Sequence, residues 1–505
     1  MRSGARALLA RLTVAAASGA VLVLAFPSTN EHWIGFAALT PLVLVLRSAR
    51  RARYGALAGF VAGFTFFGIL LAWISRFGFV AWGVLVTAEA LAWAVFGALA
   101  ARTSRFGPVM RLVGWPFLWA GIEMARARYP FGGFAWGGLG DTQIDGGGVI
   151  HLARWGGVFC VSAAVFAVNV LIAEVVAGGA LSRRAVLVAI AAALVFAPVA
   201  IPLGLAGTRS GTVDLAAVQP DVPRERFTSI GHNGRIGPED TIIVDSAASE
   251  TATISASDPP QLVVWPENTL DRDPRTHPEV ATPTRDAVRR LRVPFIVGAI
   301  LDEGETRFRN SNLLLDPSGT IVGRYDKIHL VPFGEYVPWR WARRVVPALD
   351  RELPYDGVPG SRPVVFDVAG ARVGTVICFE STYPGLVRTL VRRGAQLVVV
   401  TTNDASFGNS PAAEQHLQMS RMRAIESGRA VVHDAISGIS AIVMPDGRVV
   451  ESAARWERAV LRAELPLTDG QTPYTRFGSA IEFAIAAAAA VVAGAATVRV
   501  MVTAA

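Results

Sequence analysis

Long apolar runs, seven before residue 205 and one after residue 477, constrain the fold of this 505-residue chain more than any other feature. Each is close to the length that crosses about 30 Å of hydrocarbon as a helix, although the second is short. The runs cover residues 7–26, 33–47, 54–75, 79–101, 108–126, 155–178, 185–204 and 478–500. The first could be a signal peptide if it stood alone, but the runs that follow favour a membrane span. The sequence therefore predicts a membrane α-helical bundle of about eight spans.

The arginines predict how this bundle is oriented. Clusters lie before or at the start of the first run and in alternate loops after it: Arg2, Arg6 and Arg11; Arg47, Arg50, Arg51 and Arg53; Arg102 and Arg105; Arg183 and Arg184. Positive charge favours the cytoplasmic side. We therefore expect a multi-pass protein of the cell (inner or plasma) membrane with both termini cytoplasmic and residue 205 outside. Minor exceptions lie on the outer face: Arg76, Arg126, Arg128 and Arg154.

Charge and cysteine content narrow the function classes. The formal net charge of +8 could indicate a nucleic-acid partner, but the arginines are scattered or flank apolar runs, so we expect none. Cys160 and Cys378 lie in different regions, and no Cys/His spacing is typical of a metal site. We therefore expect no disulfide framework, no metal and no cofactor.

The composition changes between the seventh and eighth runs, where charged residues and proline increase. Short apolar segments there predict strands, with helical patterns between them at 284–291, 384–393 and 412–428. The strands are expected at 213–218, 261–265, 294–300, 373–379, 396–402 and 430–443, with a hairpin at 311–325. Alternating strands and helices indicate an α/β fold. The predicted domains are a bundle at 1–207, an extracytoplasmic catalytic domain at 208–470, and a last span with a cytoplasmic tail at 471–505.

Two features of the predicted spans and their loops leave alternatives open. The Gly- and Trp-rich outer loop from Tyr129 to Trp155 is typical of an interfacial connection. Glu89 lies within a span, and a buried acid there could belong to an ion path. A transporter is nevertheless not favoured, because the sequence offers no evident basic partner and no pair of broken helices.

Lys327 is the only lysine in the chain, since 47 of the 48 basic residues are arginine. Arginine keeps its charge in proteins and spreads it over a planar fork, whereas lysine is a compact charge whose pKa responds to burial. One lysine in an arginine-rich chain indicates a site that needs an ammonium group. Codon bias with one surviving surface lysine is the alternative.

Three residues at the predicted strand ends could form one reactive site: Glu267, Lys327 and Cys378. Taken singly, Glu267 could be a surface acid and Cys378 a buried core residue. Together they supply a thiol nucleophile, a base for its proton and a cation for an oxyanion. The N–H of Phe379 is a second candidate oxyanion donor. The set predicts acyl transfer through a thioester without a catalytic histidine.

Several motifs resemble known families. Trp265-Pro266-Glu267 and Val376-Ile377-Cys378-Phe379-Glu380, with Lys327, resemble the nitrilase (carbon–nitrogen hydrolase) superfamily. The 325–335 segment, YDKIHLVPFGE, after several membrane spans resembles the bacterial apolipoprotein N-acyltransferases. Further matches are QIDG at 143–146, TND at 402–404 and HLQMSRMRA at 416–424. The sequence departs from the family pattern at Phe379 and Ser406, where we expect altered lipid contacts.

The resemblance implies an αββα sandwich on a membrane bundle and a reaction in two half-steps. Cys378 would take an acyl chain from a phospholipid, and the amine of diacylglyceryl-cysteine in an apolipoprotein would then receive it. Glu267 would be the base and then the acid, and Lys327 would stabilise the oxyanion. Glu335 and Glu380 would support them, and Asn403 would contact substrate. The alternatives are a membrane-tethered amidase, in which water resolves the thioester, and a non-enzymatic membrane protein.

The segment from Tyr336 to Arg362 carries Trp339 and Trp341 among arginines. Tryptophan favours headgroup depth and arginine can hold phosphate. We expect a lid over the acyl pocket that dips into the bilayer, with a plain surface loop as the alternative. Changing both tryptophans to alanine should slow acyl loading of Cys378 and leave the fold intact, and unchanged loading would remove the lid role.

Overall fold

The computed structural model describes residues 2–49, 51–204, 206–222, 241–339, 343 and 355–502. The chain divides into two compact units. One contains Met1–Pro202 together with Phe477–Ala505, and the other contains Leu203–Arg476. Trp341 of the expected lid lies outside the described residues.

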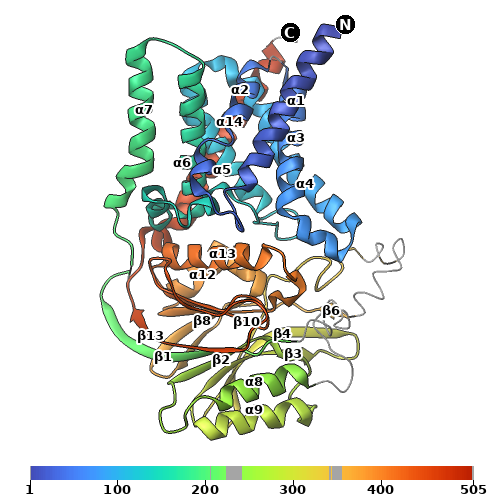
Figure 1. Cartoon of the computed structure of the whole chain (residues 1–505), viewed down its shortest axis with the longest axis vertical. Helices are drawn as coiled ribbons and strands as arrows, with labels where there is room; N and C mark the ends of the chain where they lie inside the picture. Colours follow the sequence, from blue (N-terminus) through green and yellow to red (C-terminus); the bar gives the residue numbers. More distant parts are fainter. Residues whose placement is uncertain are drawn as a thin grey trace. The chain divides into compact units, whose positions relative to one another are not determined.

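The first unit is a bundle of α-helices (Figure 1). Within the described part of the chain, six helical segments are long and apolar enough to cross a membrane. The helices concerned are α1 (Arg2–Val23), α3 (Ala52–Leu70), α4 (Phe79–Thr103), α6 (Ala153–Val176), α7 (Leu181–Phe196, extended by a 3₁₀ turn) and α14 (Pro473–Val502). The two other predicted runs form the shorter α2 (Thr40–Ser48) and α5 (Trp115–Arg126). The membrane-bundle prediction is confirmed, with about eight spans as an approximate count.

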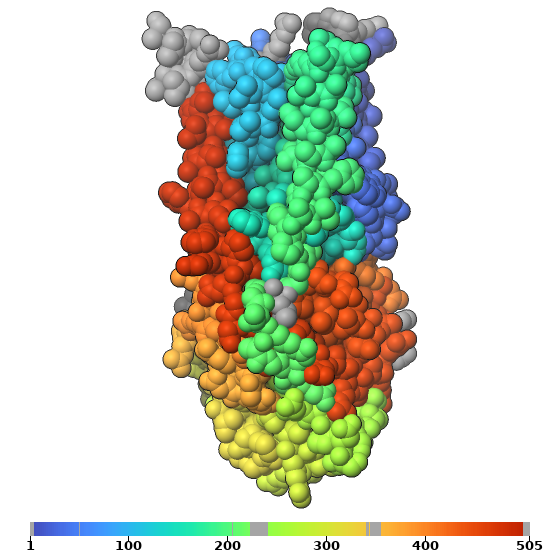
Figure 2. All heavy atoms as spheres, turned by 90° about the vertical axis from the view of Figure 1, so that its left-hand side faces the viewer, coloured from blue at the N-terminus to red at the C-terminus, as the bar shows by residue number. Residues whose placement is uncertain are grey.

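The outer surface of the bundle suits contact with lipid tails. Figure 2 shows α7 in green along the face turned to the viewer. Its side chains include Leu181, Val186, Val188 and Phe196, each more than half exposed. Apolar side chains at this density on an outer face indicate an apolar surrounding rather than water.

Glu89 and Glu174, two acidic side chains buried inside the bundle, are paired with arginines. Arg126 lies 2.9 Å from Glu89 and also donates to the carbonyl oxygens of Phe134 and Trp136. Our expectation that Glu89 lacks a basic partner was therefore wrong. The partner was missed because Arg126 ends α5, well separated from Glu89 in sequence. A buried glutamate joined to an arginine that also ties down the 134–136 backbone has a structural explanation.

The 129–155 segment, expected as an interfacial connection, folds into the bundle. It contains two short 3₁₀ helices at Leu139–Gln143 and Gly148–Leu152. Thr142 and Gln143 are fully buried, and the N–H of Leu139 donates to Glu123 at 2.8 Å. Backbone groups without a regular helical partner thus find side-chain partners inside the protein, as irregular backbone at membrane depth requires.

The second unit is a four-layer αββα sandwich, with α8 and α9 on one outer face and α12 and α13 on the other (Figure 1). The helices are α8 (Ile242–Ala252), α9 (Pro278–Leu291), α12 (Pro384–Arg392) and α13 (Ala412–Ser427). One sheet has the order β13-β1-β2-β3-β4-β5 with β6 beside β4, and the other has the order β12-β11-β10-β9-β8-β7. The prediction of an α/β sandwich is confirmed.

The strand bounds are as follows. The first sheet contains β1 (Arg209–Gln219), β2 (Leu262–Leu270), β3 (Phe295–Asp302), β4 (Arg307–Leu315), β5 (Ile321–Asp326), β6 (Asp356–Gly357) and β13 (Ala459–Thr468). The second contains β7 (Val365–Val368), β8 (Ala371–Ile377), β9 (Leu397–Thr402), β10 (Ala430–Ala435), β11 (Ala441–Val443) and β12 (Val449–Ser452).

Apolar side chains from both sheets form the central layer. Val213, Leu215 and Val264 of the first sheet belong to one buried cluster with Leu397 and Val432 of the second. The parallel core strands, such as β2 and β9, are buried on both faces, so they appear in the sequence as continuous apolar runs. This is why the sequence located them well.

One predicted strand was wrong. Residues 430–443 form two antiparallel strands, β10 and β11, with Val432 opposite Ile442. The turn contains Gly438, where a Cβ atom would collide with Asp404. An apolar run with a short polar interruption can be one strand or a hairpin, and composition alone did not separate them.

The Glu89–Arg126 pair generates a prediction for the stability of the bundle. Arg126→Ala should destabilise it by about 3–5 kcal/mol, because a buried carboxylate loses its counter-charge. Glu89→Gln combined with Arg126→Met should recover much of this loss. Arg183→Ala, at a more exposed arginine beside Glu174, is the control. Thermal unfolding of the detergent-solubilised chain measures all three, and an Arg126→Ala protein as stable as the control would contradict the assignment.

Candidate active site

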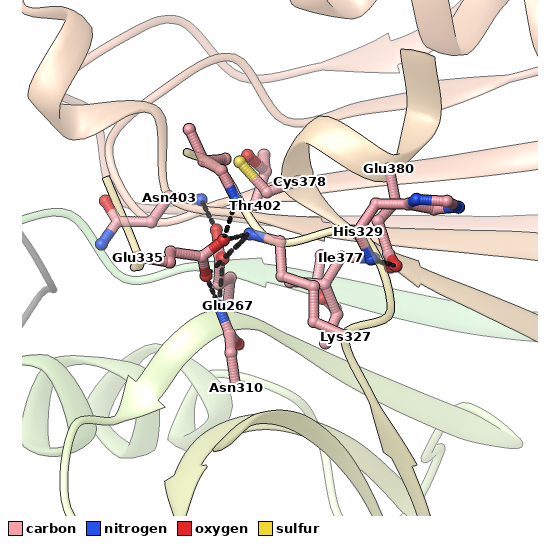
Figure 3. Close-up of polar contacts among 12 residues, drawn as sticks. Glu267, Asn310, Lys327, His329, Glu335, Ile377, Cys378, Glu380, Thr402 and Asn403 are labelled. Carbon is pink, nitrogen blue, oxygen red and sulfur yellow. Dashed lines mark hydrogen bonds and ion pairs between the residues drawn. The ribbon is translucent and has the colours of Figure 1, made fainter. Parts of the chain in front are cut away.

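Glu267, Lys327 and Cys378 come from three strands in two sheets. Glu267 lies within β2, Lys327 directly follows β5, and Cys378 directly follows β8. Figure 3 shows the Glu267 carboxylate, the Lys327 amine and the Cys378 sulfur grouped together. The fold thus brings together three residues that are far apart in the sequence.

A local irregularity positions Glu267. The pairing of β2 with β3 shifts register between Trp265 and Leu270. Gly298 of the neighbouring strand β3 packs against this irregular part of β2, and a Cβ there would collide with the backbone of Pro266 and Glu267. Glycine at 298 therefore permits the bulge that carries Glu267, since bulges reorient side chains beside functional sites.

Lys327 lies between two carboxylates and is only 2% exposed. Its Nζ is 3.2 Å from Glu267 Oε1 and 3.0 Å from Glu335 Oε1. A buried ammonium with two carboxylate partners remains charged, because each carboxylate offsets part of the cost of removing it from water. The alternative of a random surface lysine does not fit this position.

Backbone and amide donors fix the two carboxylates. Asn310 Nδ2 donates to Glu267 Oε1 at 2.6 Å and to Glu335 Oε1 at 3.0 Å. The N–H of Asn403 donates to Glu267 Oε2 at 2.8 Å, and the N–H of Val331 donates to Glu335 Oε2 at 2.8 Å. Each carboxylate oxygen therefore has a partner, and the charges are held in place before any substrate binds.

Glu380 holds the backbone around the site and does not contact Lys327 directly. It is fully buried and accepts hydrogen bonds from the N–H groups of Ile328 (2.7 Å), His329 (3.0 Å) and Ile377 (2.9 Å). The Tyr325 hydroxyl donates to it at 2.7 Å. Glu380 thereby ties residues on both sides of Lys327 to the end of β8, just ahead of Cys378.

The electrostatics of the site set the resting protonation states. Burial acts to lower the pKa of Lys327, but Glu267 and Glu335 outweigh it and hold that pKa well above the usual value. Burial and the Glu267 carboxylate raise the pKa of Cys378 well above that of an ordinary thiol, although Lys327 acts in the opposite direction. The Lys327 ammonium therefore favours the thiolate, but it does not offset burial and Glu267. The thiol rests protonated and needs a base when it attacks.

Three more of the predicted site residues lie within the described part of the chain. Phe379 is buried against Tyr383, with ring centroids 5.6 Å apart. Asn403 faces Glu267 through its backbone N–H. Trp339 is 41% exposed and lies 6.1 Å from the Phe333 ring, centroid to centroid.

Some polar residues at the site were not predicted from the sequence. Asn310 was not singled out, although it touches both carboxylates. The signal that could have located it is a polar side chain in a strand that is otherwise buried. Asp404 and His416 were quoted only as parts of motifs, and with His433 they form a cluster whose potential ligand atoms lie within 4.8 Å of one another. These side chains are close enough for a metal site, but His416 uses both ring nitrogens in hydrogen bonds, to Asp404 and to the Cys378 carbonyl.

The opposing influences on Cys378 lead to a prediction for Glu267→Gln. The change removes a base but also removes the negative charge that raises the pKa of the thiol. Acyl loading should therefore fall, while alkylation of Cys378 by iodoacetamide should move to lower pH. Measuring alkylation against pH in a Cys160→Ala background tests this. Lys327→Met is the matched variant and should move the curve to higher pH. A Glu267→Gln curve that stays in place or moves upward would contradict the assignment.

Comparisons with known proteins agree with the fold and the motifs. Residues 18–171 match the model of the apolipoprotein N-acyltransferase N-terminal domain, and residues 243–472 match the carbon–nitrogen hydrolase model. An apolipoprotein N-acyltransferase from Geobacter metallireducens is 32% identical, over 95% of this chain and 94% of that protein. One from Mycolicibacterium smegmatis is 31% identical, over 94% and 83%. A solved amidase from Nesterenkonia sp. AN1 is 20% identical over 54% of this chain and 95% of its own, with a TM-score of 0.37. The chain therefore belongs to the apolipoprotein N-acyltransferase family.

Proposed function

We propose that this protein transfers an acyl chain from a phospholipid, through a thioester on Cys378, to the amino-terminal amine of diacylglyceryl-cysteine in apolipoproteins. The observation that carries the proposal is the buried Lys327 ammonium, 3.2 Å from Glu267 and grouped with Cys378 in a chain with long membrane helices. Family membership supports the acyl transfer and the lipoprotein acceptor. The phospholipid donor is inferred from the need for an acyl ester at a membrane.

In the first half-reaction, Glu267 takes the thiol proton as the Cys378 sulfur attacks the ester carbonyl. The carbonyl oxygen becomes an oxyanion, which Lys327 stabilises together with a backbone N–H, for which Phe379 is the candidate. The C–O bond then breaks and Glu267 returns the proton to the departing lysophospholipid oxygen. The raised pKa of the thiol fits this order, because sulfur becomes a nucleophile only as the base acts.

In the second half-reaction, the acceptor amine attacks the thioester carbonyl. Glu267 takes a proton from the attacking nitrogen, and the C–S bond of the second tetrahedral intermediate breaks. The proton then passes to the leaving sulfur, which restores the thiol. Glu335 holds Lys327 and gives the site a second negative charge, which attracts the acceptor as an ammonium. The ammonium releases one proton to solvent before it attacks as the neutral amine.

The acyl-transfer proposal predicts a trapped intermediate. The purified full chain, incubated with vesicles of phosphatidylethanolamine and phosphatidylglycerol, should gain one acyl mass on the peptide that contains Cys378. A diacylated lipopeptide should then remove the mass and become triacylated. Cys378→Ala should show no adduct, and Cys160→Ala is the matched control that should load normally. Release as free fatty acid would support an amidase, and a wild-type chain without an adduct would contradict the proposal.

We also propose that the second unit lies on the extracytoplasmic side of the membrane and that both termini are cytoplasmic. The alternating arginine clusters support this orientation. The acceptor would then meet the site on the side to which lipoproteins are exported.

The orientation predicts how two single-cysteine variants behave in cells. In a Cys160→Ala, Cys378→Ala background, Glu464→Cys should react with a membrane-impermeant maleimide in intact spheroplasts. Arg184→Cys, in the first turn of α7, should react only after the membrane is permeabilised. Both positions are exposed in the structure, so access to reagent and not local burial decides the result. The reverse labelling pattern would refute the orientation.

A further inference from the structure

The nucleophile has a backbone conformation that non-glycine residues rarely adopt. Cys378 has a φ of 53°, in the left-handed region, at the turn between β8 and the 3₁₀ helix Cys378–Thr382. Such a conformation persists only where neighbouring contacts hold it. Glu380 accepts from the preceding N–H, that of Ile377. On the following side, His416 Nε2 of α13 lies 3.1 Å from the Cys378 carbonyl oxygen.

The partners of His416 fix its protonation. A backbone carbonyl only accepts hydrogen bonds, so Nε2 must carry a hydrogen to bond with Cys378. Nδ1 lies 3.0 Å from Asp404 Oδ1, and an ionised carboxylate also only accepts. Both ring nitrogens therefore carry hydrogen, and the ring is a charged imidazolium. The Ser381 hydroxyl, 3.0 Å from Nε2, can share the same hydrogen.

The surroundings of this pair are consistent with that charge. Asp404 also accepts from the Thr402 hydroxyl at 2.8 Å. His433 of β10 faces the pair, with Nε2 3.8 Å from Asp404 and Nδ1 2.8 Å from the Ser420 hydroxyl. Burial lowers the pKa of His433. Burial acts to lower the pKa of His416 as well, but Asp404 outweighs it, and Glu267 of β2 adds to the rise. The net effect is one charged histidine beside one neutral histidine.

We propose that the buried Asp404–His416 ion pair is a positioning device for the nucleophile: Asp404 keeps His416 protonated, and His416 holds the Cys378 carbonyl so that the sulfur is aimed at the acyl carbon. His416 bonds the backbone of Cys378 and leaves the thiol proton to Glu267. Its role therefore differs from that of a catalytic base. The inference deepens the proposed acyl transfer and rests on it for the activity readout.

The device has a pH dependence with a definite sign. The imidazolium exists below the raised pKa of His416 and is lost as pH rises through it. Asp404→Asn removes the charge that raises this pKa, so the imidazolium should be lost at lower pH. Acyl loading by Asp404→Asn should then decline on the alkaline side at a lower pH than loading by the wild type.

The direct test compares His416→Leu, which removes the donor, with His416→Gln, which keeps an uncharged N–H donor. Loading of the full chain should fall about 100-fold in His416→Leu, the effect of a misplaced reacting group. His416→Gln should recover part of the rate and lose the alkaline decline. Apparent affinity for phospholipid should change little, because the substitution alters the orientation of the Cys378 sulfur and leaves the lipid contacts unchanged. Asp273→Asn, at another buried and ion-paired aspartate of this unit, is the matched control.

Several outcomes would overturn the inference. Normal acyl loading by His416→Leu would overturn it, and so would a pH profile of Asp404→Asn loading that matches the wild type. An Asp273→Asn pH profile that shifts as far as that of Asp404→Asn would overturn it as well, as would one equivalent of zinc in the purified protein. Iodoacetamide alkylation of Cys378, in the Cys160→Ala background and without lipid, separates this inference from the proposed function. Slower alkylation in His416→Leu than in His416→Gln supports the positioning role even if the wild type fails to load an acyl chain. Equal rates in both variants would refute it.

Discussion

The site depends on one electrostatic constraint: a buried ammonium must remain charged beside a thiol that must remain neutral until it attacks. Lys327 satisfies the first part because Glu267 and Glu335 lie 3.2 and 3.0 Å from it. The same carboxylate at 267 satisfies the second part, since it raises the pKa of Cys378. The Glu267 carboxylate thus both stabilises the Lys327 ammonium and keeps the Cys378 thiol protonated. In the proposed mechanism, the thiol loses its proton to Glu267 as it attacks the carbonyl carbon.

The αββα sandwich provides the rigid support for this arrangement. The proposed reacting groups lie within or directly after strands of both sheets, and the apolar layer between the sheets supports them. Backbone N–H groups of Asn403 and Val331 hold the carboxylates, so their geometry follows from the fold instead of from flexible side chains. Polar networks of this kind are stable in a low-dielectric interior only when every member is paired.

The sequence predicted most of this because the informative features were local. Long apolar runs located the helices, buried strands appeared as continuous apolar segments, and a unique lysine marked the site. What it missed depends on contacts between distant segments. Arg126 reaches Glu89, Asn310 bridges two carboxylates, and His416 contacts the backbone of Cys378. The 430–443 hairpin was missed for a related reason, since pairing between strands decided where the chain turned.

Because Lys327 is the only lysine, ¹⁵N-lysine labelling of the full chain gives one side-chain amine signal, and its pH titration tests the central claim most directly. The structure predicts that this amine stays protonated at pH values above about 10.4, where an ordinary lysine loses its proton. In Glu335→Gln the titration should move to lower pH. A wild-type signal that titrates at or below the ordinary lysine pKa would contradict the account.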